Sequence, residues 1–258
     1  MGGISRMIKA ELGEDTYVLP LMVGSNIADD MKNGFFMPVN DQVDLVCDMV
    51  KKDPRLQDGF NAMGFSQGGQ FMRAYIQRCN TPKVHNFISV GGQHQGVFGM
   101  PKCTGQNFFC EEMKVLLNAG AYLPFVQNYL VQAEYWHDPL QEEVYKKSCV
   151  FMPEINNELA AKNQTYRENL QSLNRFVMIK FTKDTMVTPP ESEWFGFYAP
   201  GQDKEITTLK ESDLYKEDWL GLQEMDKNGQ LVFLSVEGDH LRFSHEWFVA
   251  EIINKYLV

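Results

Sequence analysis

Short apolar runs alternate with helix-like stretches along the first part of this chain. Apolar runs of about 4–8 residues bounded by turn residues are typical of buried strands, whereas apolar residues spaced three and four apart are typical of helices. The pattern predicts strands near residues 16–23, 60–65 and 86–90, and helices near 40–52 and 70–78. Strands that alternate with helices in this way indicate an α/β fold with a mostly parallel central sheet.

A Gly-x-Ser-x-Gly motif, in which Ser66 is the serine, lies between the apolar run 60–65 and the helix-like run 70–78. In this context the motif is typical of a nucleophile elbow, a sharp strand-to-helix turn that exposes the serine hydroxyl. We expect the flanking Gly64 and Gly68 to be needed, because a Cβ at either position would clash with the neighbouring strand or helix. The alternative is a glycine-rich turn with an incidental serine.

A serine nucleophile of the α/β-hydrolase type is followed in the chain by an acid and then by a histidine, each after a later strand. The apolar run 175–181 precedes Asp184, and the apolar run 231–236 precedes His240 and a helix-like stretch over 244–255. The sequence therefore predicts Asp184 as the acid and His240 as the base. Asp184 as the start of a turn or helix is the alternative, since Asp is common in both places.

These residues have distinct expected roles. Ser66 would attack an acyl carbonyl, His240 would act first as base and then as acid, and Asp184 would orient the imidazole. The backbone N–H of Gln67 would stabilise the oxyanion, together with a second N–H from the loop after an earlier strand.

The other four histidines do not fit the role of base. His85, His94 and His137 precede Asp184, which is the wrong order, and His245 falls in an apolar helical stretch where a packed or solvated ring is expected. No histidines have convincing zinc spacing with cysteines or carboxylates. We therefore expect neither a metal nor another cofactor.

Composition limits the class of protein. At 258 residues with 44% apolar residues, the chain suits a single domain with an ample core. The formal net charge of −10 and the lack of a basic stripe argue against a nucleic-acid partner. No apolar run approaches the length of about 18 residues or more that a transmembrane helix requires.

Longer blocks of the sequence resemble the palmitoyl-protein thioesterase family, lysosomal serine hydrolases that remove thioester-linked fatty acyl groups from cysteines. The blocks are 59–71 (GFNAMGFSQGGQF), 89–103, 130–139, 192–198 and 229–241, and the resemblance runs along essentially the whole chain. It implies an α/β-hydrolase fold and the same three residues, Ser66, Asp184 and His240. It also implies S-acylated proteins or peptides and fatty acyl thioesters as substrates, and a location in the lysosome or secretory route.

The alternation of strands and helices stops between residues 96 and 174, where the pattern predicts mainly short helices. A connection of this length is typical of a functional insertion. We expect residues 1–258 to form one α/β-hydrolase domain, with 96–174 as a cap insertion over the active site. The aromatic residues of this insertion are candidates for lining an acyl groove, although packing within the cap is the simpler role for any one of them: Phe98, Phe108, Phe109, Tyr122, Phe125, Tyr129, Tyr135 and Trp136.

Five cysteines suggest two disulfides. Cys103 and Cys110 flank a short loop, while Cys47 and Cys79 lie near the ends of the helices before and after the nucleophile strand. The resemblance implies the pairs Cys47–Cys79 and Cys103–Cys110, which leaves Cys149 unpaired. The alternative is a set of reduced, buried cysteines in a cytosolic enzyme.

Asn163 begins an Asn-Gln-Thr sequon in a polar stretch of the insertion. A glycan on Asn163 would agree with a protein of the secretory route.

The chain begins in a helical stretch, 4–12, whereas in the resembling family a signal peptide, a strand and a His-Gly loop precede this helix. We therefore expect the first strand segment and the second oxyanion donor to be missing from this sequence. Two alternatives to an active thioesterase follow. One is a catalytically silent truncated form that binds acyl groups or a partner; the other is a general carboxylesterase or lipase, because a Ser-His-Asp triad does not distinguish a thioester from an oxygen ester.

Overall fold

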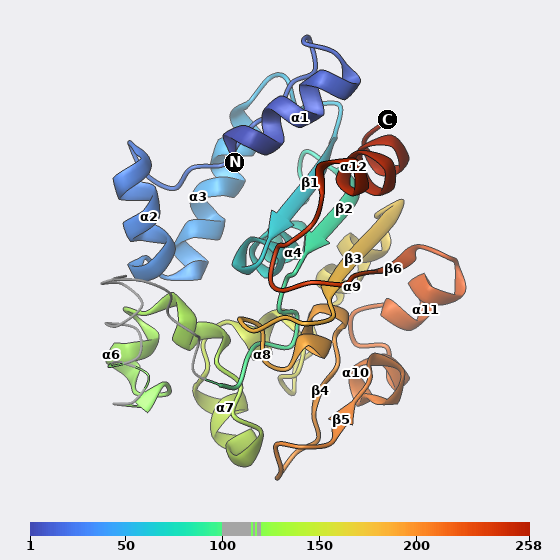
Figure 1. The fold of residues 1–258 in the computed structure, drawn as a ribbon. Coiled ribbons are helices and arrows are strands. Elements are labelled where there is room, and N and C mark those ends of the chain that lie inside the picture. Colours follow the sequence, from blue (N-terminus) through green and yellow to red (C-terminus); the bar gives the residue numbers. More distant parts are fainter. Residues whose placement is uncertain (100–114, 116, 118–119) are drawn as a thin grey trace.

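A parallel four-stranded sheet lies at the centre of the computed structural model, which describes residues 1–99, 115, 117 and 120–258 (Figure 1). Its strands, in the spatial order β1-β2-β3-β6, are Phe60–Phe65, Val84–Val90, Arg175–Phe181 and Leu231–Val236. All three pairings are parallel. The α/β fold with a parallel sheet is thus confirmed, and all four strands match the predicted runs closely.

Successive side chains of the strands point to opposite faces of the sheet, as strand geometry requires. In β3, Phe176 and Met178 join one apolar core, whereas Val177, Ile179 and Phe181 join the core on the other face. Both faces of this strand are therefore buried, which explains why it reads as a continuous apolar run.

Helices cover both faces of the sheet. The helices α3 (Val39–Lys52), α4 (Gln67–Arg78), α9 (Gln164–Gln171) and α11 (Leu222–Lys227) contribute to the core on one face. The other face is covered by α1 (Gly2–Leu12), α12 (His245–Phe248) and the π-helix η5 (Val249–Leu257). The first and last helices of the chain consequently lie side by side (Figure 1).

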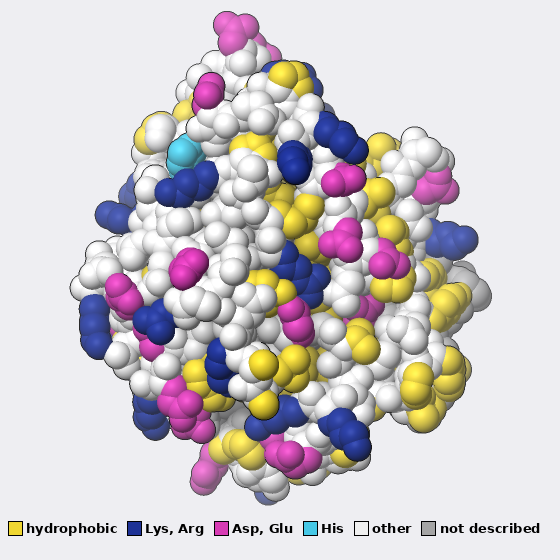
Figure 2. Space-filling view, turned by 180° about the vertical axis from the view of Figure 1, so that it is seen from behind, with side chains coloured by type: hydrophobic (Ala, Val, Ile, Leu, Met, Phe, Trp, Pro, Cys, Tyr) yellow, Lys and Arg dark blue, Asp and Glu magenta, His cyan; other side chains and the backbone are white. Residues whose placement is uncertain are grey.

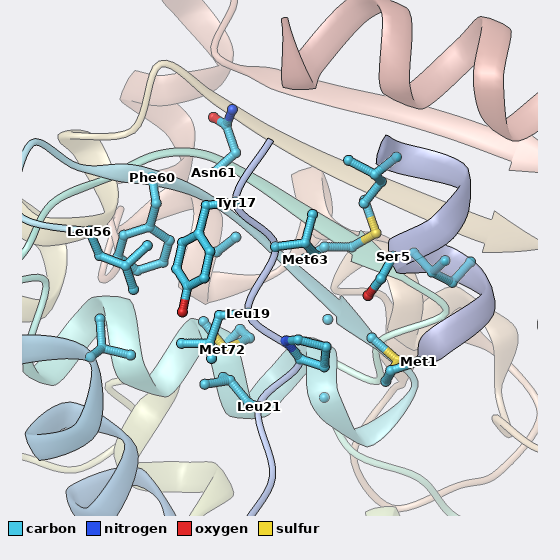
Figure 3. Close-up of a pocket in the computed structure, with 18 of the residues that line it drawn as sticks. Met1, Ser5, Tyr17, Leu19, Leu21, Leu56, Phe60, Asn61, Met63 and Met72 are labelled. Atoms are coloured by element: carbon cyan, nitrogen blue, oxygen red, sulfur yellow. The ribbon is translucent and has the colours of Figure 1, made fainter. Parts of the chain in front are cut away.

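The strand predicted near residues 16–23 is absent from the structure, so that prediction is wrong. Residues of this segment and of β1 line an apolar cleft of about 510 Å³, into which Tyr17, Leu19 and Met63 all project (Figure 3). A strand exists only where its backbone pairs with a neighbour. The cleft separates the segment from β1, so an apolar run that reads as a strand forms none.

The remaining helices and strands are short. After α2 (Ile27–Phe36), they are α6 (Pro124–Gln127), η1 (Val131–Tyr135), η2 (Pro139–Gln141), α7 (Glu142–Ser148), α8 (Met152–Ile155), η3 (Pro190–Trp194), β4 (Phe197–Tyr198), β5 (Ile206–Thr207), η4 (Leu209–Glu211) and α10 (Asp213–Lys216). The two-residue strands β4 and β5 form a separate antiparallel pair. Within the described part of the chain, no helix is long and apolar enough to span a membrane.

A buried arginine joins the insertion 96–174 to the helix that follows the elbow. Arg73 of α4 donates hydrogen bonds to the carbonyl oxygens of His94 and Ile155, both at 3.0 Å, and to Asn156 Oδ1 at 2.7 Å. Burial lowers the pKa of Arg73 to about 9. The guanidinium thus holds the short helix α8 against α4.

One of the two expected disulfides is seen in the described residues. Cys47 of α3 and Cys79, directly after α4, are bonded, with their Cα atoms 6.0 Å apart. Cys103 and Cys110 lie outside the described residues, so that pairing stays a prediction. Cys149 is a free thiol, buried, and donates to the carbonyl oxygen of Glu134.

Candidate active site

Ser66 lies on a sharp turn between β1 and α4. Its φ of 52° and ψ of −125° belong to a region that residues with a Cβ rarely adopt. The turn allows no Cβ at Gly64, where it would lie 2.1 Å from the carbonyl oxygen of Gly68, or at Gly69, where it would lie 2.8 Å from the Cα of Gly92. A Cβ at Gly68 meets nothing within 4 Å, so our expectation that Gly68 is sterically required was wrong.

The parallel sheet brings three distant segments to one edge. Ser66 follows β1, Asp184 follows β3 and His240 follows β6, and the carboxyl ends of parallel strands share an edge of the sheet. The loops after β3 and β6 are also bonded to each other, because Thr182 N–H donates to Val236 O and Lys183 N–H to Gly238 O, both at 3.0 Å.

A continuous hydrogen-bond chain joins the three side chains predicted from the sequence. His240 Nε2 lies 2.8 Å from Ser66 Oγ, and His240 Nδ1 lies 2.5 Å from Asp184 Oδ2. Since an ionised carboxylate only accepts hydrogen bonds, we assign the proton of a neutral ring to Nδ1, which leaves Nε2 to accept from the serine hydroxyl. This is the arrangement that a serine nucleophile needs.

Asp184 is held as a carboxylate. Burial alone raises its pKa, but the interactions with His240, with Glu193 and with the Val187 N–H outweigh that effect and lower it below the ordinary value. Asp184 Oδ1 accepts the N–H groups of Met186 at 2.7 Å and Val187 at 2.8 Å. These bonds fix the carboxylate, whose side chain is fully buried, against the imidazole.

Asp239 is a second carboxylate close to His240 in the chain, but it has another role. Its Oδ1 accepts the N–H of His240 at 2.8 Å and the N–H and hydroxyl of Thr185, both at 2.9 Å. Asp239 therefore shapes the backbone of the histidine loop rather than contacting the ring.

Glu193 was not anticipated from the sequence, although it lies in the block 192–198. This residue of η3 is 1% exposed, and its Oε2 accepts the N–H of Phe181 at 2.8 Å. Ligand atoms of Glu193, Asp184 and His240 lie within 4.8 Å of one another. The spacing of these atoms would suit a cation, but His240 Nδ1 and Asp184 Oδ2 are already hydrogen-bonded to each other.

Gln67 joins the elbow to neighbouring helices. As the first residue of α4, it has a backbone N–H without an acceptor inside the helix. Its side-chain nitrogen donates to the carbonyl oxygen of Gly34 at 3.0 Å, and its Oε1 accepts the hydroxyl of Tyr135 at 3.3 Å. A residue of the segment 96–174 thus contacts the residue directly after Ser66.

The other histidines have different partners in the described residues. His94 Nε2 lies 2.9 Å from Ser89 Oγ, while His137 lies between Gln95 O and Glu142. His245 is exposed at the start of α12. The position of His245 agrees with the solvated ring expected for it.

The aromatic residues of the insertion divide into buried and exposed ones. Tyr135 is 7% exposed, whereas Phe125 and Tyr129 are 59% and 47% exposed. Phe98 packs on Trp136, with ring centroids 5.6 Å apart. Phe108 and Phe109 lie outside the described residues, and an acyl groove lined by this group stays a prediction.

Charged side chains of both signs are interspersed over the face in Figure 2, with hydrophobic side chains between them. This face carries no basic stripe of the kind that a nucleic-acid surface needs. The sequon residue Asn163 is exposed at the start of α9, where its side chain accepts the N–H of Thr165.

The parallel sheet, the sharp strand-to-helix turn at Ser66 and the hydrogen-bonded Ser66, His240 and Asp184 are features of the α/β-hydrolase fold. A family model described as palmitoyl protein thioesterase matches residues 1–240. The chain is 47% identical over 258 residues to palmitoyl-protein thioesterase 1 of Caenorhabditis elegans, covering 100% of this chain and 86% of that protein. It is 38% identical over 226 residues to palmitoyl-protein thioesterase 3 of Dictyostelium discoideum, covering 88% and 75%.

A more distant relative is the lysosomal thioesterase PPT2-B of Xenopus laevis, which is 30% identical over 186 residues, covering 70% of this chain and 62% of that protein. The chain belongs to the palmitoyl-protein thioesterase family.

Proposed function

We propose that this chain hydrolyses thioesters between long-chain fatty acyl groups, such as palmitoyl, and cysteines of proteins or peptides. The observation that carries the proposal is the hydrogen-bond chain from Ser66 through His240 to Asp184 in a member of this family. S-acylated proteins or peptides and free fatty acyl thioesters are the proposed partners.

The first half of the reaction forms an acyl-enzyme. Ser66 Oγ attacks the thioester carbonyl carbon while His240 Nε2 takes the hydroxyl proton, and Asp184 stabilises the resulting imidazolium. The N–H of Gln67 donates to the negative oxygen of the tetrahedral intermediate. The intermediate then collapses, the carbon–sulfur bond breaks, and the proton on His240 passes to the leaving cysteine sulfur.

The second half releases the fatty acid. A water molecule gives a proton to His240 Nε2 and attacks the acyl carbonyl; the bond to Ser66 Oγ then breaks, and the proton returns to the serine. No other reactant is required. We propose that residues 96–174 act as a cap over this site and that the protein works in the lysosome or secretory route, as the names of its lysosomal relatives suggest.

Single substitutions test the three roles. Ser66→Ala, His240→Ala and Asp184→Ala are each expected to lower kcat on a palmitoyl thioester by about 10⁴-fold or more, without additive effects in combination. His245→Ala and Asp239→Asn are the matched controls and should keep most of the activity. Near-normal turnover in Asp184→Ala would contradict the assignment of the acid.

The leaving group is tested separately. We expect kcat/KM for a palmitoyl thioester to exceed that for the matched oxygen ester, and a fluorophosphonate probe to label Ser66. A clear preference for the oxygen ester would favour a general carboxylesterase or lipase. A protein that binds acyl groups but shows neither turnover nor labelling would be the catalytically silent alternative.

A further inference from the structure

Glu193 is a buried acid that lies beside the proposed triad but takes no part in the proposed reaction steps. Among the described residues, its Oε1 meets no N–H or O–H donor, although its Oε2 is satisfied by the Phe181 N–H. An ionised carboxylate with one buried oxygen left without a donor is costly. A neutral acid has no such deficit, because it carries its own proton.

Asp184 offers a place for that proton. A carboxylate has about four acceptor positions. The N–H groups of Met186 and Val187 occupy two on Oδ1, and His240 occupies one on Oδ2. One position on Oδ2 is left, and carboxyl oxygens of Glu193 and Asp184 lie within 4.8 Å of each other.

The charges around Glu193 favour the same arrangement. Asp184 and His240 face it from the loops after β3 and β6. Lys180 of β3 instead pairs with Glu191 at 3.8 Å and lies over the ring of Trp194, so no cation neutralises Glu193 by direct contact in the described residues. Burial, followed by the hydrogen bond with Asp184 and the charge of Asp184, raises the pKa of Glu193 to about 10.

We propose that Glu193 is a positioning residue of the triad. It keeps its proton under working conditions and uses it to donate a hydrogen bond to the carboxylate of Asp184. The proposal rests on the proposed function, because it assigns to Glu193 an effect on Asp184 and hence on His240. The pair then bears a single negative charge, located on Asp184, and a second hydrogen bond to Oδ2 helps to fix the orientation of that carboxylate.

The decisive variant is Glu193→Gln, because a glutamine can donate to Asp184 through its amide nitrogen and accept the Phe181 N–H through its oxygen. We expect it to keep kcat and the acid limb of the pH–rate profile, whereas Glu193→Ala should lower kcat by up to about 10²-fold with little change in KM. Glu191→Gln, the neighbouring acid on η3, should leave all three quantities unchanged.

An ionised Glu193 predicts a different result. Its negative charge would ease protonation of His240, so that Glu193→Gln would move the acid limb to lower pH by about half a unit or more. Such a shift would overturn the proposal, as would Glu193→Ala with the kcat of the unaltered protein. If Glu193→Ala does not fold, the comparison with Glu193→Gln alone decides the question.

Infrared spectroscopy tests the proton independently of turnover. The difference spectrum of the unaltered protein minus Glu193→Gln at neutral pH should contain the C=O stretch of a protonated carboxylic acid. The absence of this band would overturn the proposal even in an active enzyme. Its presence in a protein that hydrolyses no thioester would support the pairing with Asp184 while contradicting the proposed function.

Discussion

The proposed triad consists of three side chains that lie far apart in the sequence and are joined by hydrogen bonds in the structure. Each of Ser66, Asp184 and His240 follows an apolar run, and parallel strands necessarily place such residues at a common edge. Glu193 could not be found in this way. It comes from η3, and a short sequence with one acid gives no sign that the acid will be buried.

The motif does not show which glycines the elbow requires. The motif marks Gly64 and Gly68, but the tight approaches occur at Gly64 and Gly69, where α4 passes close to β1 and to Gly92. The contact at Gly69 involves Gly92, a residue from another loop. Local sequence carries no information on that distance.

Alanine substitutions at the elbow separate these glycines. Gly64→Ala places a Cβ 2.1 Å from a backbone oxygen and is expected to destabilise the fold by about 1–3 kcal/mol or more, with loss of Ser66 labelling. Gly68→Ala meets open space in a helix and should be neutral or stabilising by up to about 1 kcal/mol. Urea unfolding and fluorophosphonate labelling measure both effects. Equal losses in the two variants would contradict the contact geometry.

At the scale of elements, apolar runs predicted strands well where both faces of the sheet are covered. The strand predicted near residues 16–23 does not form, because the apolar side chains of this segment line the cleft beside β1 and its backbone pairs with none of the described strands. The predicted helices were located correctly, and the ends of α3 and α4 at Lys52 and Arg78 match the prediction. Two limits differ: α4 begins at Gln67 rather than at residue 70, and the last helix continues to Leu257 as a π-helix.

The disulfide that joins α3 to the end of α4 is expected to stabilise the protein. Cys47 and Cys79 are 32 residues apart, and closing a loop of that length contributes about 2–4 kcal/mol by restricting the unfolded chain. Replacing both by alanine should lower the free energy of unfolding by that amount, whereas Cys149→Ala serves as a control that removes a free thiol.

Peptide mapping of protein made through a secretory route checks the same prediction directly. It should recover the Cys47–Cys79 and Cys103–Cys110 peptides as disulfides and a glycan on Asn163. Five free thiols would contradict both the pairing and the proposed compartment.

For the whole molecule, buried acids make stability depend on pH. Burial, opposed by the hydrogen bond from the Val39 N–H, raises the pKa of Glu134 to about 8, and Glu193 stays protonated to about pH 10. Unfolded glutamates ionise near 4.5, so above that value the folded protein holds more protons than the unfolded chain. Stability therefore falls as the pH rises towards the folded pKa of each acid.

A clear window for this effect lies between pH 6.5 and pH 8. Below 6.5, His94, whose pKa is lowered by burial and by Arg73, opposes the trend, because the unfolded histidine binds a proton that the folded one does not. Above about 8, Glu134 ionises in both states. Asp184 and Glu142, with lowered pKa values, are ionised in both states throughout the window and add no slope.

We therefore expect the free energy of unfolding to decrease from pH 6.5 to pH 8, with Glu134 contributing at most about 1.4 kcal/mol per pH unit. Glu134→Gln keeps an acceptor for the Val39 N–H but no ionisable group, so it should flatten the slope; Glu246→Gln, which removes an exposed carboxylate, should not. Urea unfolding at several pH values measures each slope. A flat or rising profile in the unaltered protein would show that these buried glutamates are ionised in the folded state. Their protonation would then give no reason for greater stability on the acidic side of neutrality.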